Sequence, residues 1–100
     1  MTLKNKRRDS LLRSRYGITL KEYNALHRIQ KRKCSICGKP QQELKKRLDV
    51  DHNHKTGYIR GLLCPYCNRK LLKYLKDDKK RTQGLIKYLQ RALEGDKKWK

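Results

Sequence analysis

Apolar residues recur at helical spacing between residues 19 and 33, and they predict a helix from about Leu20 to Lys31. The apolar positions of this segment are Leu20, Tyr23, Leu26 and Ile29. Thr19 comes directly before them and Glu22 three residues later, which is the capping-box pattern. Because each of these side chains accepts a hydrogen bond from the backbone of the other residue, the pattern defines the start of the helix.

Two further helices are predicted towards the ends of the chain. Residues 9–17, "DSLLRSRYG", predict a short helix that ends at Gly17, because glycine readily adopts the left-handed conformation of a helix stop. Residues 1–8 are polar and basic, and we expect them to be mobile. A last amphipathic helix should begin near Thr82 and end at Gly95. Its apolar positions are Leu85, Ile86, Leu89 and Leu93.

The middle of the chain predicts a β-hairpin with a Cys-x-x-Cys knuckle on each side. Residues 48–51 suit a short strand, residues 55–57 a turn and residues 58–60 a returning strand. Pro65 in the second knuckle is tolerated at a helix start. A helix should then run from Asn68 through "RKLLKYLK" until "DDKKRTQG" interrupts it. The predicted order is helix, knuckle, two strands, knuckle and two helices.

The composition limits the size of the hydrophobic core. The chain has 100 residues, of which only 35% are hydrophobic, and it contains no Phe. Small domains of this kind usually need a disulfide, a metal or a partner chain for stability. The 29 Lys and Arg residues against nine Asp and Glu leave a net charge of +20. Self-repulsion at that level favours a polyanionic partner.

The basic charge is concentrated at the two ends of the sequence. Residues 1–33 hold eleven basic and two acidic residues, residues 68–100 hold twelve and four, and residues 34–67 hold six and three. Such charge can form a solvated surface or bind acidic membranes. Nucleic acid is the better explanation, because candidate residues for phosphate chemistry lie between the basic ends. The two basic arms would contact phosphates without reading sequence, so the affinity should fall steeply with salt.

The four cysteines predict a structural zinc site. No apolar run is long enough to span a membrane and no signal-peptide core follows the basic start, so we expect no membrane partner and a cytoplasmic location. Cysteines stay reduced there, which favours metal binding over disulfides. The paired spacing can place four thiolates around one tetrahedral ion, with no open position for a substrate. Buried or redox-active cysteines are the alternative. The predicted ligands are Cys34, Cys37, Cys64 and Cys67.

A second metal site is predicted inside the segment that the two knuckles enclose. Asp51 ends the first strand, and Asn68 directly follows the last cysteine. If the helix bearing Asn68 packs across the hairpin, the two oxygen ligands would form a sparse, hydrated site that suits Mg²⁺ or Mn²⁺. Because neighbouring side chains of a regular strand point to opposite faces, Asp51 and His52 cannot both face the metal from such a strand. Either a bend displaces one of them, or one serves a different role beside the metal. Alternatively, Asp51 anchors the turn and Asn68 caps its helix.

These residues can be assigned roles in phosphodiester hydrolysis. A neutral imidazole can accept a proton from water near pH 7, which suggests His52 as the general base. His54 is a second candidate that orients the phosphate or assists protonation, although a lone loop histidine is more often structural. The planar guanidinium of Arg60 could bind a phosphate through two of its N–H groups. We expect Arg60, Lys55 and Arg69 to contact DNA, and we interpret His27 as an ordinary surface or interface residue.

The sequence resembles a known family over about residues 16–71. The block from "YGITLKEYNAL" through "CSICGK" and "LDVDHNHKTGYIRGLLCPYCN" is similar to the phage recombination endonuclease VII family, a branch of the HNH or ββα-metal nucleases. The resemblance implies zinc on the four cysteines, a divalent catalytic ion on Asp51 and Asn68, His52 as general base and His54 as an auxiliary group. It also implies a phage protein in the host cytoplasm, or a bacterial cytoplasmic protein. The middle Asn of the HNH pattern has no clear counterpart, since Asn53 lies very close to His52.

The resemblance also implies the fold. We expect a small α+β protein with a ββα-metal (His-Me finger) hairpin–helix core, stapled by the four-cysteine zinc site and flanked by N- and C-terminal basic helices. Residues 1–100 would form a single HNH endonuclease domain. Within it, residues 1–33 are the basic helical arm, residues 34–75 the zinc-bound ββα-metal core and residues 76–100 the C-terminal amphipathic helix.

The expected function is hydrolysis of phosphodiester bonds in DNA by a metal-dependent endonuclease. Members of the family cut branched DNA such as Holliday junctions, so the partner would be double-stranded or branched DNA. A general nicking or double-strand HNH endonuclease in phage DNA processing is the first alternative. A non-catalytic zinc-ribbon DNA-binding module is the second. The apolar stripes of residues 20–30 and of the last helix exceed what one small core can bury, so we also expect a homodimer.

Overall fold

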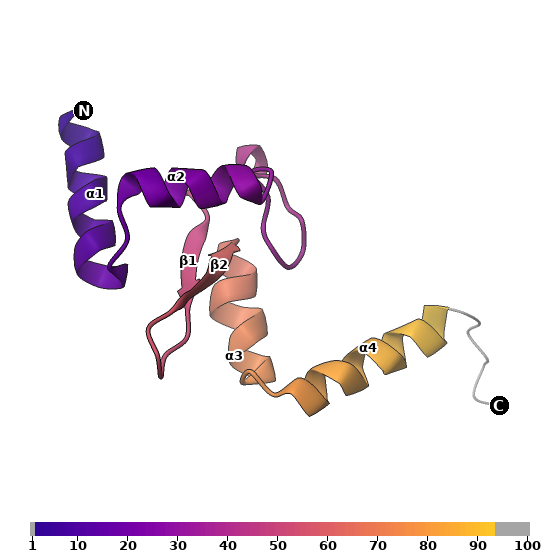
Figure 1. Ribbon diagram of the computed structural model, residues 1–100. Helices are drawn as coiled ribbons and strands as arrows, with labels where there is room; N and C mark the ends of the chain where they lie inside the picture. The colour runs from indigo at the N-terminus through magenta and orange to yellow at the C-terminus, as the bar shows by residue number, and fades with distance from the viewer. Residues whose placement is uncertain (1, 94–100) are drawn as a thin grey trace.

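The computed structural model describes residues 2–93, the last two by their backbone alone. These residues form a small α+β fold with four α-helices and one two-stranded sheet, which confirms the predicted class (Figure 1). The predicted helix stop at Gly95 lies outside the described residues. The elements are α1 (Leu3–Tyr16), α2 (Leu20–Ile29), the short 3-10 turn η1 (Gln41–Glu43), β1 (Asp49–His52), β2 (Ile59–Leu63), the π-helical turn η2 (Cys67–Leu71), α3 (Leu72–Leu75) and α4 (Lys79–Leu93).

Helix α1 starts earlier than the sequence predicts. The prediction of mobile residues before Asp9 is wrong, because the helix already begins at Leu3. The Thr2 hydroxyl accepts a hydrogen bond at 3.1 Å from the backbone N–H three residues on, and the Lys and Arg residues that follow are good helix formers. The predicted stop is confirmed. Gly17 has a φ of 73°, and its N–H donates to Arg13 O at 3.0 Å.

Helix α2 begins with the predicted capping box. The Glu22 N–H donates to the Thr19 hydroxyl and the Thr19 N–H donates to the Glu22 carboxylate, each at 3.0 Å. A second carboxylate joins α2 to α1, because Asp9 Oδ1 accepts from the Leu20 N–H at 2.7 Å. Figure 1 shows the start of α2 beside the middle of α1, and this hydrogen bond connects these two parts of the helices.

The predicted hairpin is confirmed, and it contains a bulge. Strands β1 and β2 are antiparallel, with Asp51 opposite Gly61 but His52 opposite Ile59. Arg60 is therefore the extra residue of β2. The shift in register falls between Asp51 and His52.

Asn53 organises the predicted turn between the strands. Its side-chain oxygen accepts from the N–H groups of Lys55 at 2.8 Å and Thr56 at 3.1 Å. Its own N–H donates to Tyr58 O at 2.8 Å, and its carbonyl accepts from Gly57 at 2.7 Å. Gly57 has a φ of 79°, a conformation that favours glycine. An asparagine at this position thus closes the hairpin by local hydrogen bonds.

The core lies between the hairpin, α2 and the cysteine knuckles. Its most buried side chains are Leu62, at 0% exposure, and Cys67, at 2%. Tyr23 of α2 enters it, and its hydroxyl donates to Leu48 O at 2.7 Å. The buried residues of this cluster are Tyr23, Cys34, Leu48, Val50, Leu62, Leu63, Cys64 and Cys67. Three of the four cysteines therefore belong to the core itself.

The interpretation of His27 as a surface or interface residue is wrong. Its ring is buried and stacks on Tyr23, with the ring centroids 6.0 Å apart. Its Nε2 lies 3.3 Å from Gln41 Oε1, which also accepts from the Leu48 N–H at 2.9 Å. Gln41 lies fourteen residues beyond His27, so helical periodicity alone could not indicate this partner.

The predicted helix after the second knuckle is present. The chain enters helical conformation at Pro65, passes through η2 and continues in α3. Asn68 lies inside this helix, so the alternative that it caps the helix is wrong. Lys76 and Asp77, each with a φ of 54°, then turn the chain towards α4.

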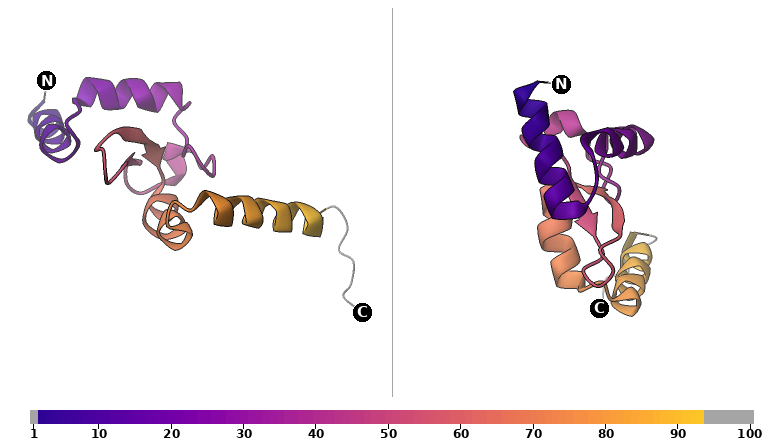
Figure 2. Two further views of the ribbon diagram at one scale, coloured as in Figure 1. Left: turned by 60° about the horizontal axis from the view of Figure 1, so that its bottom comes forward. Right: turned by 60° about the vertical axis from the view of Figure 1, so that its left-hand side comes forward.

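Helix α4 begins at Lys79, earlier than the predicted Thr82. The reason is Asp78, whose carboxylate accepts from the Arg81 N–H at 3.1 Å and so caps the helix start. Helix α4 points away from the rest of the structure, and its apolar side chains Leu85, Ile86 and Leu89 are 40–50% exposed (Figure 2). The molecule is accordingly elongated, with extents of 63 × 31 × 20 Å. Across residues 2–93, no helix has the length and hydropathy that crossing a membrane requires.

Candidate functional site

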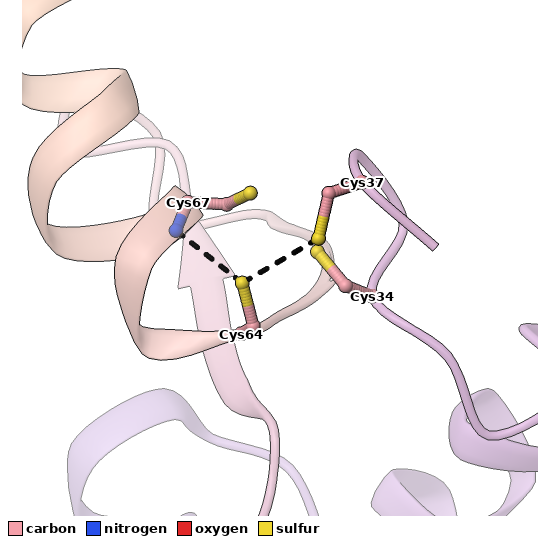
Figure 3. A group of neighbouring side chains, drawn as sticks. All are labelled: Cys34, Cys37, Cys64 and Cys67. Atoms are coloured by element: carbon pink, nitrogen blue, oxygen red, sulfur yellow. Dashed lines mark hydrogen bonds between the residues drawn. The ribbon is translucent and has the colours of Figure 1, made fainter. Parts of the chain in front are cut away.

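The four predicted zinc ligands converge on one point (Figure 3). Cys34 and Cys37 come from the loop after α2, while Cys64 follows β2 and Cys67 begins η2. Their Sγ atoms all lie within 4.8 Å of one another, and those of Cys37 and Cys64 are 3.7 Å apart. Within residues 2–93 this is the one group of three or more His, Cys, Asp or Glu side chains close enough to share an ion.

Backbone groups support this cluster from both knuckles. The Ile36 N–H donates to Cys34 Sγ and the Cys67 N–H donates to Cys64 Sγ, each at 3.4 Å. In the first knuckle Gly38, with a φ of 76°, donates its N–H to Cys34 O at 3.0 Å. The tight turns direct the sulfur atoms inward, and each N–H···S hydrogen bond favours a thiolate over a thiol.

The electrostatics of the cluster also suit a cation. Burial disfavours ionisation of Cys34, but hydrogen bonds from backbone N–H groups outweigh it and lower the pKa of this thiol to about 6. Burial and the neighbouring sulfur atoms instead raise the pKa of Cys67. Four sulfur donors in tetrahedral reach are the donor set that zinc prefers. The cluster fits a structural zinc ion, which would join the loop after α2 to both ends of the second knuckle.

The Asp51 carboxylate lies at the bulge of the hairpin and binds Arg60 through both oxygens. Arg60 Nε donates to Oδ2 at 2.8 Å and Arg60 Nη2 donates to Oδ1 at 3.1 Å. The same Nη2 lies 3.4 Å from Asp77 Oδ1, beyond the end of α3. The hydrogen bonds that Arg60 donates to Asp51, and secondarily to Asp77, raise the pKa of Arg60. The residue expected to contact a phosphate is thus paired with two carboxylates.

Both predicted ligands of the second metal ion, Asp51 and Asn68, line one pocket. It has a volume of about 320 Å³ and lies between the hairpin and the helix η2–α3. Its lining residues are Asp51, His54, Arg60, Asn68, Leu72, Lys73, Lys76 and Asp77. Asp51 and Asn68 therefore face the same space. The Asn68 side-chain NH₂ donates to Asp49 Oδ2 at 3.3 Å, which leaves its side-chain oxygen available to a ligand.

His52 lies beside this pocket and does not belong to its lining. Its ring centroid is 4.7 Å from that of His54 and 5.6 Å from that of Tyr16, at the end of α1. The two imidazoles are therefore neighbours, one in the pocket and one between the pocket and α1. His52 is thus a neighbour of His54, which lines the same pocket as Asp51 and Asn68.

The other expected DNA contacts occupy different environments. Lys55 is exposed at the hairpin tip. Arg69 is also exposed, and its Nε donates to Asp49 Oδ2 at 3.2 Å. Their roles towards DNA stay predictions.

Three residues of the site were not singled out by sequence reasoning. Asp49 supports Asn68 and Arg69, Asp77 binds Arg60, and Tyr16 contacts His52. The spacing of Asp49 and Asp51 could have indicated the first, because alternate residues of a strand lie on one face. The other two come from distant elements, so no local pattern indicates them.

Residues 9–91 match the sequence profile of the family described as recombination endonuclease VII. This match covers most of the chain, which therefore belongs to the recombination endonuclease VII family.

Two curated relatives come from mycobacteriophages. The Gene 59 protein of Mycobacterium phage D29 is 45% identical over 76 residues, which are 76% of this chain and 46% of that protein. The Gene 59 protein of Mycobacterium phage L5 is 43% identical over 79 residues, which are 79% of this chain and 43% of that protein. The chain thus spans less than half the length of these relatives. No solved structure is a significant match to it.

Proposed function

We propose that this chain is a metal-dependent DNA endonuclease of the HNH, or ββα-metal, type. The observation that carries the proposal is the shared pocket of Asp51 and Asn68, beside the adjacent imidazoles of His52 and His54. The family membership supports nuclease activity. Strands β1 and β2 with the helix η2–α3 would be the ββα-metal core, and the cysteine cluster would hold structural zinc that fixes the hairpin against this helix.

The chain's own residues suggest how hydrolysis would proceed. Asp51 and Asn68 offer a carboxylate and an amide oxygen, which suit Mg²⁺ or Mn²⁺. Such an ion, when bound, would supply positive charge to the phosphate oxygens in the transition state. His52 would accept the proton of the attacking water, and His54 would orient the phosphate or assist protonation of the leaving oxygen.

The basic arms supply the DNA affinity in this proposal. They contain most of the net positive charge, and long basic surfaces bind phosphates with little dependence on sequence. We infer branched DNA, such as a Holliday junction, as the preferred substrate, and the cytoplasm of a bacterial host as the place of action. We also infer a homodimer, because the apolar face of α4 is exposed in the single chain.

A nicking assay on supercoiled plasmid with Mg²⁺ or Mn²⁺ tests the catalytic assignment. The zinc-loaded chain should convert supercoiled to open-circular DNA, and His52→Ala should reduce the rate by at least about a hundredfold. The zinc content and the DNA affinity of the variant are the controls, and both should match the unmodified chain. Undiminished nicking by His52→Ala would refute the role of His52. Absence of cleavage by the unmodified chain with either ion would favour the non-catalytic DNA-binding module.

Substrate choice needs a separate comparison. A synthetic four-way junction and a linear duplex made from its arms should be cut at different rates, with the junction faster. Equal rates would favour the alternative of a general nicking or double-strand endonuclease.

A further inference from the structure

The pairing of Arg60 with Asp51 conflicts with a metal ion at the same carboxylate. Both Asp51 oxygens accept hydrogen bonds from the guanidinium, at 2.8 and 3.1 Å. The Asp51 side chain is only 11% exposed, so water can replace these contacts only to a small extent. A divalent ion that coordinates Asp51 would lie close to the guanidinium charge, and repulsion between the two cations would weaken the pairing of Arg60 with Asp51.

The position of Arg60 results from the hairpin bulge. Arg60 is the residue of β2 that has no partner in the register of β1. Its side chain is 35% exposed, in contrast to that of Asp51, and it reaches the pocket from the edge. An exposed side chain at a bulge can move without disturbing the strand pairing on either side of it.

A second acceptor for the guanidinium is already present. Asp77 Oδ1 lies 3.4 Å from Arg60 Nη2, and the Asp77 side chain is 50% exposed. Asp77 lies in the left-handed turn between α3 and α4 and lines the same pocket as Arg60. When Arg60 leaves Asp51, its charge keeps a carboxylate partner.

We propose that Arg60 is a displaceable counter-ion of Asp51, which moves towards Asp77 when a divalent ion binds Asp51. This inference rests on the proposed function, because it takes Asp51 as a ligand of that ion. It assigns Arg60 a positioning role that sets the metal affinity of the site. Binding of the ion and pairing with Arg60 oppose one another, because both place positive charge at the same carboxylate, so each weakens the other.

The test measures Mn²⁺ binding to the zinc-loaded chain without DNA, by the electron paramagnetic resonance signal of free Mn²⁺. Arg60→Gln should bind Mn²⁺ about fivefold more tightly than the unmodified chain, the gain expected when a partly exposed ion pair no longer competes. Lys73→Gln is the matched control, because it removes the same charge from the same pocket without touching Asp51. Its affinity should change by less than about twofold. Equal tightening by the two variants, or no tightening by Arg60→Gln, would overturn the inference.

Asp51→Asn separates this inference from the proposed function. It should abolish Mn²⁺ binding at the pocket; unchanged binding would remove Asp51 from the metal site and refute the ligand assignment itself.

A direct measurement on the unmodified chain does not depend on the folding of Arg60→Gln. In the unmodified chain, the NMR resonance of Arg60 Nε–H should shift on addition of Mg²⁺, because the hydrogen bond to Asp51 is lost. A resonance that stays in place at saturating Mg²⁺ would overturn the inference even if the variants behave as expected.

Discussion

The side-chain amide of Gln30 pairs with both main-chain polar groups of Leu62. The Leu62 N–H donates to Gln30 Oε1 at 2.8 Å, and Gln30 Nε2 donates to Leu62 O at 2.9 Å. These are the contacts that a third strand would make with β2, so one residue at the end of α2 covers the outer edge of the hairpin. The amide also bonds Lys33 O at 2.9 Å and thereby fixes the start of the first knuckle.

Truncation of this amide should weaken the whole fold. Gln30→Ala leaves the buried N–H of Leu62 without a partner, and an unpaired buried donor costs about 1–3 kcal/mol. We expect the free energy of unfolding in urea to fall by about 2 kcal/mol. Gln42→Ala is the matched control, because Gln42 is exposed on η1, and it should change the stability by less than about 0.5 kcal/mol. Similar values for the two variants would contradict the structural role of Gln30.

Replacement by alanine should destabilise the chain at one glycine and stabilise a helix at another. Gly17→Ala places a side chain at a φ of 73° and should lower the free energy of unfolding by about 1 kcal/mol. Gly84 lies within α4, where an added Cβ meets nothing within 4 Å. Gly84→Ala should therefore increase the helicity of α4, because alanine favours a helix by about 0.5–1 kcal/mol over glycine. Circular dichroism measures both changes, and a gain in stability for Gly17→Ala would contradict the left-handed cap.

The contact between α1 and α2 should depend on pH through Asp9. The hydrogen bond from the Leu20 N–H, followed by the one from Arg13, holds the pKa of Asp9 below its usual range. A carboxyl with a lowered folded pKa contributes stability that is full above its unfolded pKa, about 3.9. That contribution is lost as the pH falls through the lower folded value. The Leu20 amide proton, followed by NMR, should shift upfield with an apparent pKa below 3.9, and in Asp9→Asn this titration should be absent.

Removal of zinc should unfold the core. The free energy of structural zinc binding is on the order of 10 kcal/mol, which is comparable with the stability of an entire small domain. We expect one zinc per chain by atomic absorption, and loss of the cooperative thermal transition after treatment with a strong chelator. Cys64→Ser should lose both the metal and the transition. A metal-free chain that melts at an unchanged temperature would show that the sulfur cluster is not a structural site.

Local signals account for the parts of the structure that the sequence predicts well. The capping box of Thr19 and Glu22, the stop at Gly17 and the paired cysteines each depend on residues a few positions apart. Their geometry is therefore fixed by short-range chemistry. The cysteine cluster was predictable for a further reason: a chain with so few apolar residues needs a metal, a disulfide or a partner chain for stability.

The predictions from sequence differ from the structure where a residue distant in sequence, or a single helix-capping residue, determines the local structure. Asp78 moves the start of α4, because its carboxylate caps a helix that hydrophobic periodicity places only from Thr82. His27 is buried by packing on Tyr23 in the same helix and by Gln41 from beyond the first knuckle. The bulge that brings Arg60 onto Asp51 depends on strand register, which alternating residues alone do not specify.

Because the two knuckles converge on one cluster, the chain between them is a closed loop with an exposed tip around Thr56. The entropic cost of lengthening such a loop is small, about 0.6 kcal/mol for each doubling. Insertions at this tip would leave the sulfur anchor and the core intact. The outer end of the hairpin can therefore vary in length and sequence while the inner end keeps its geometry.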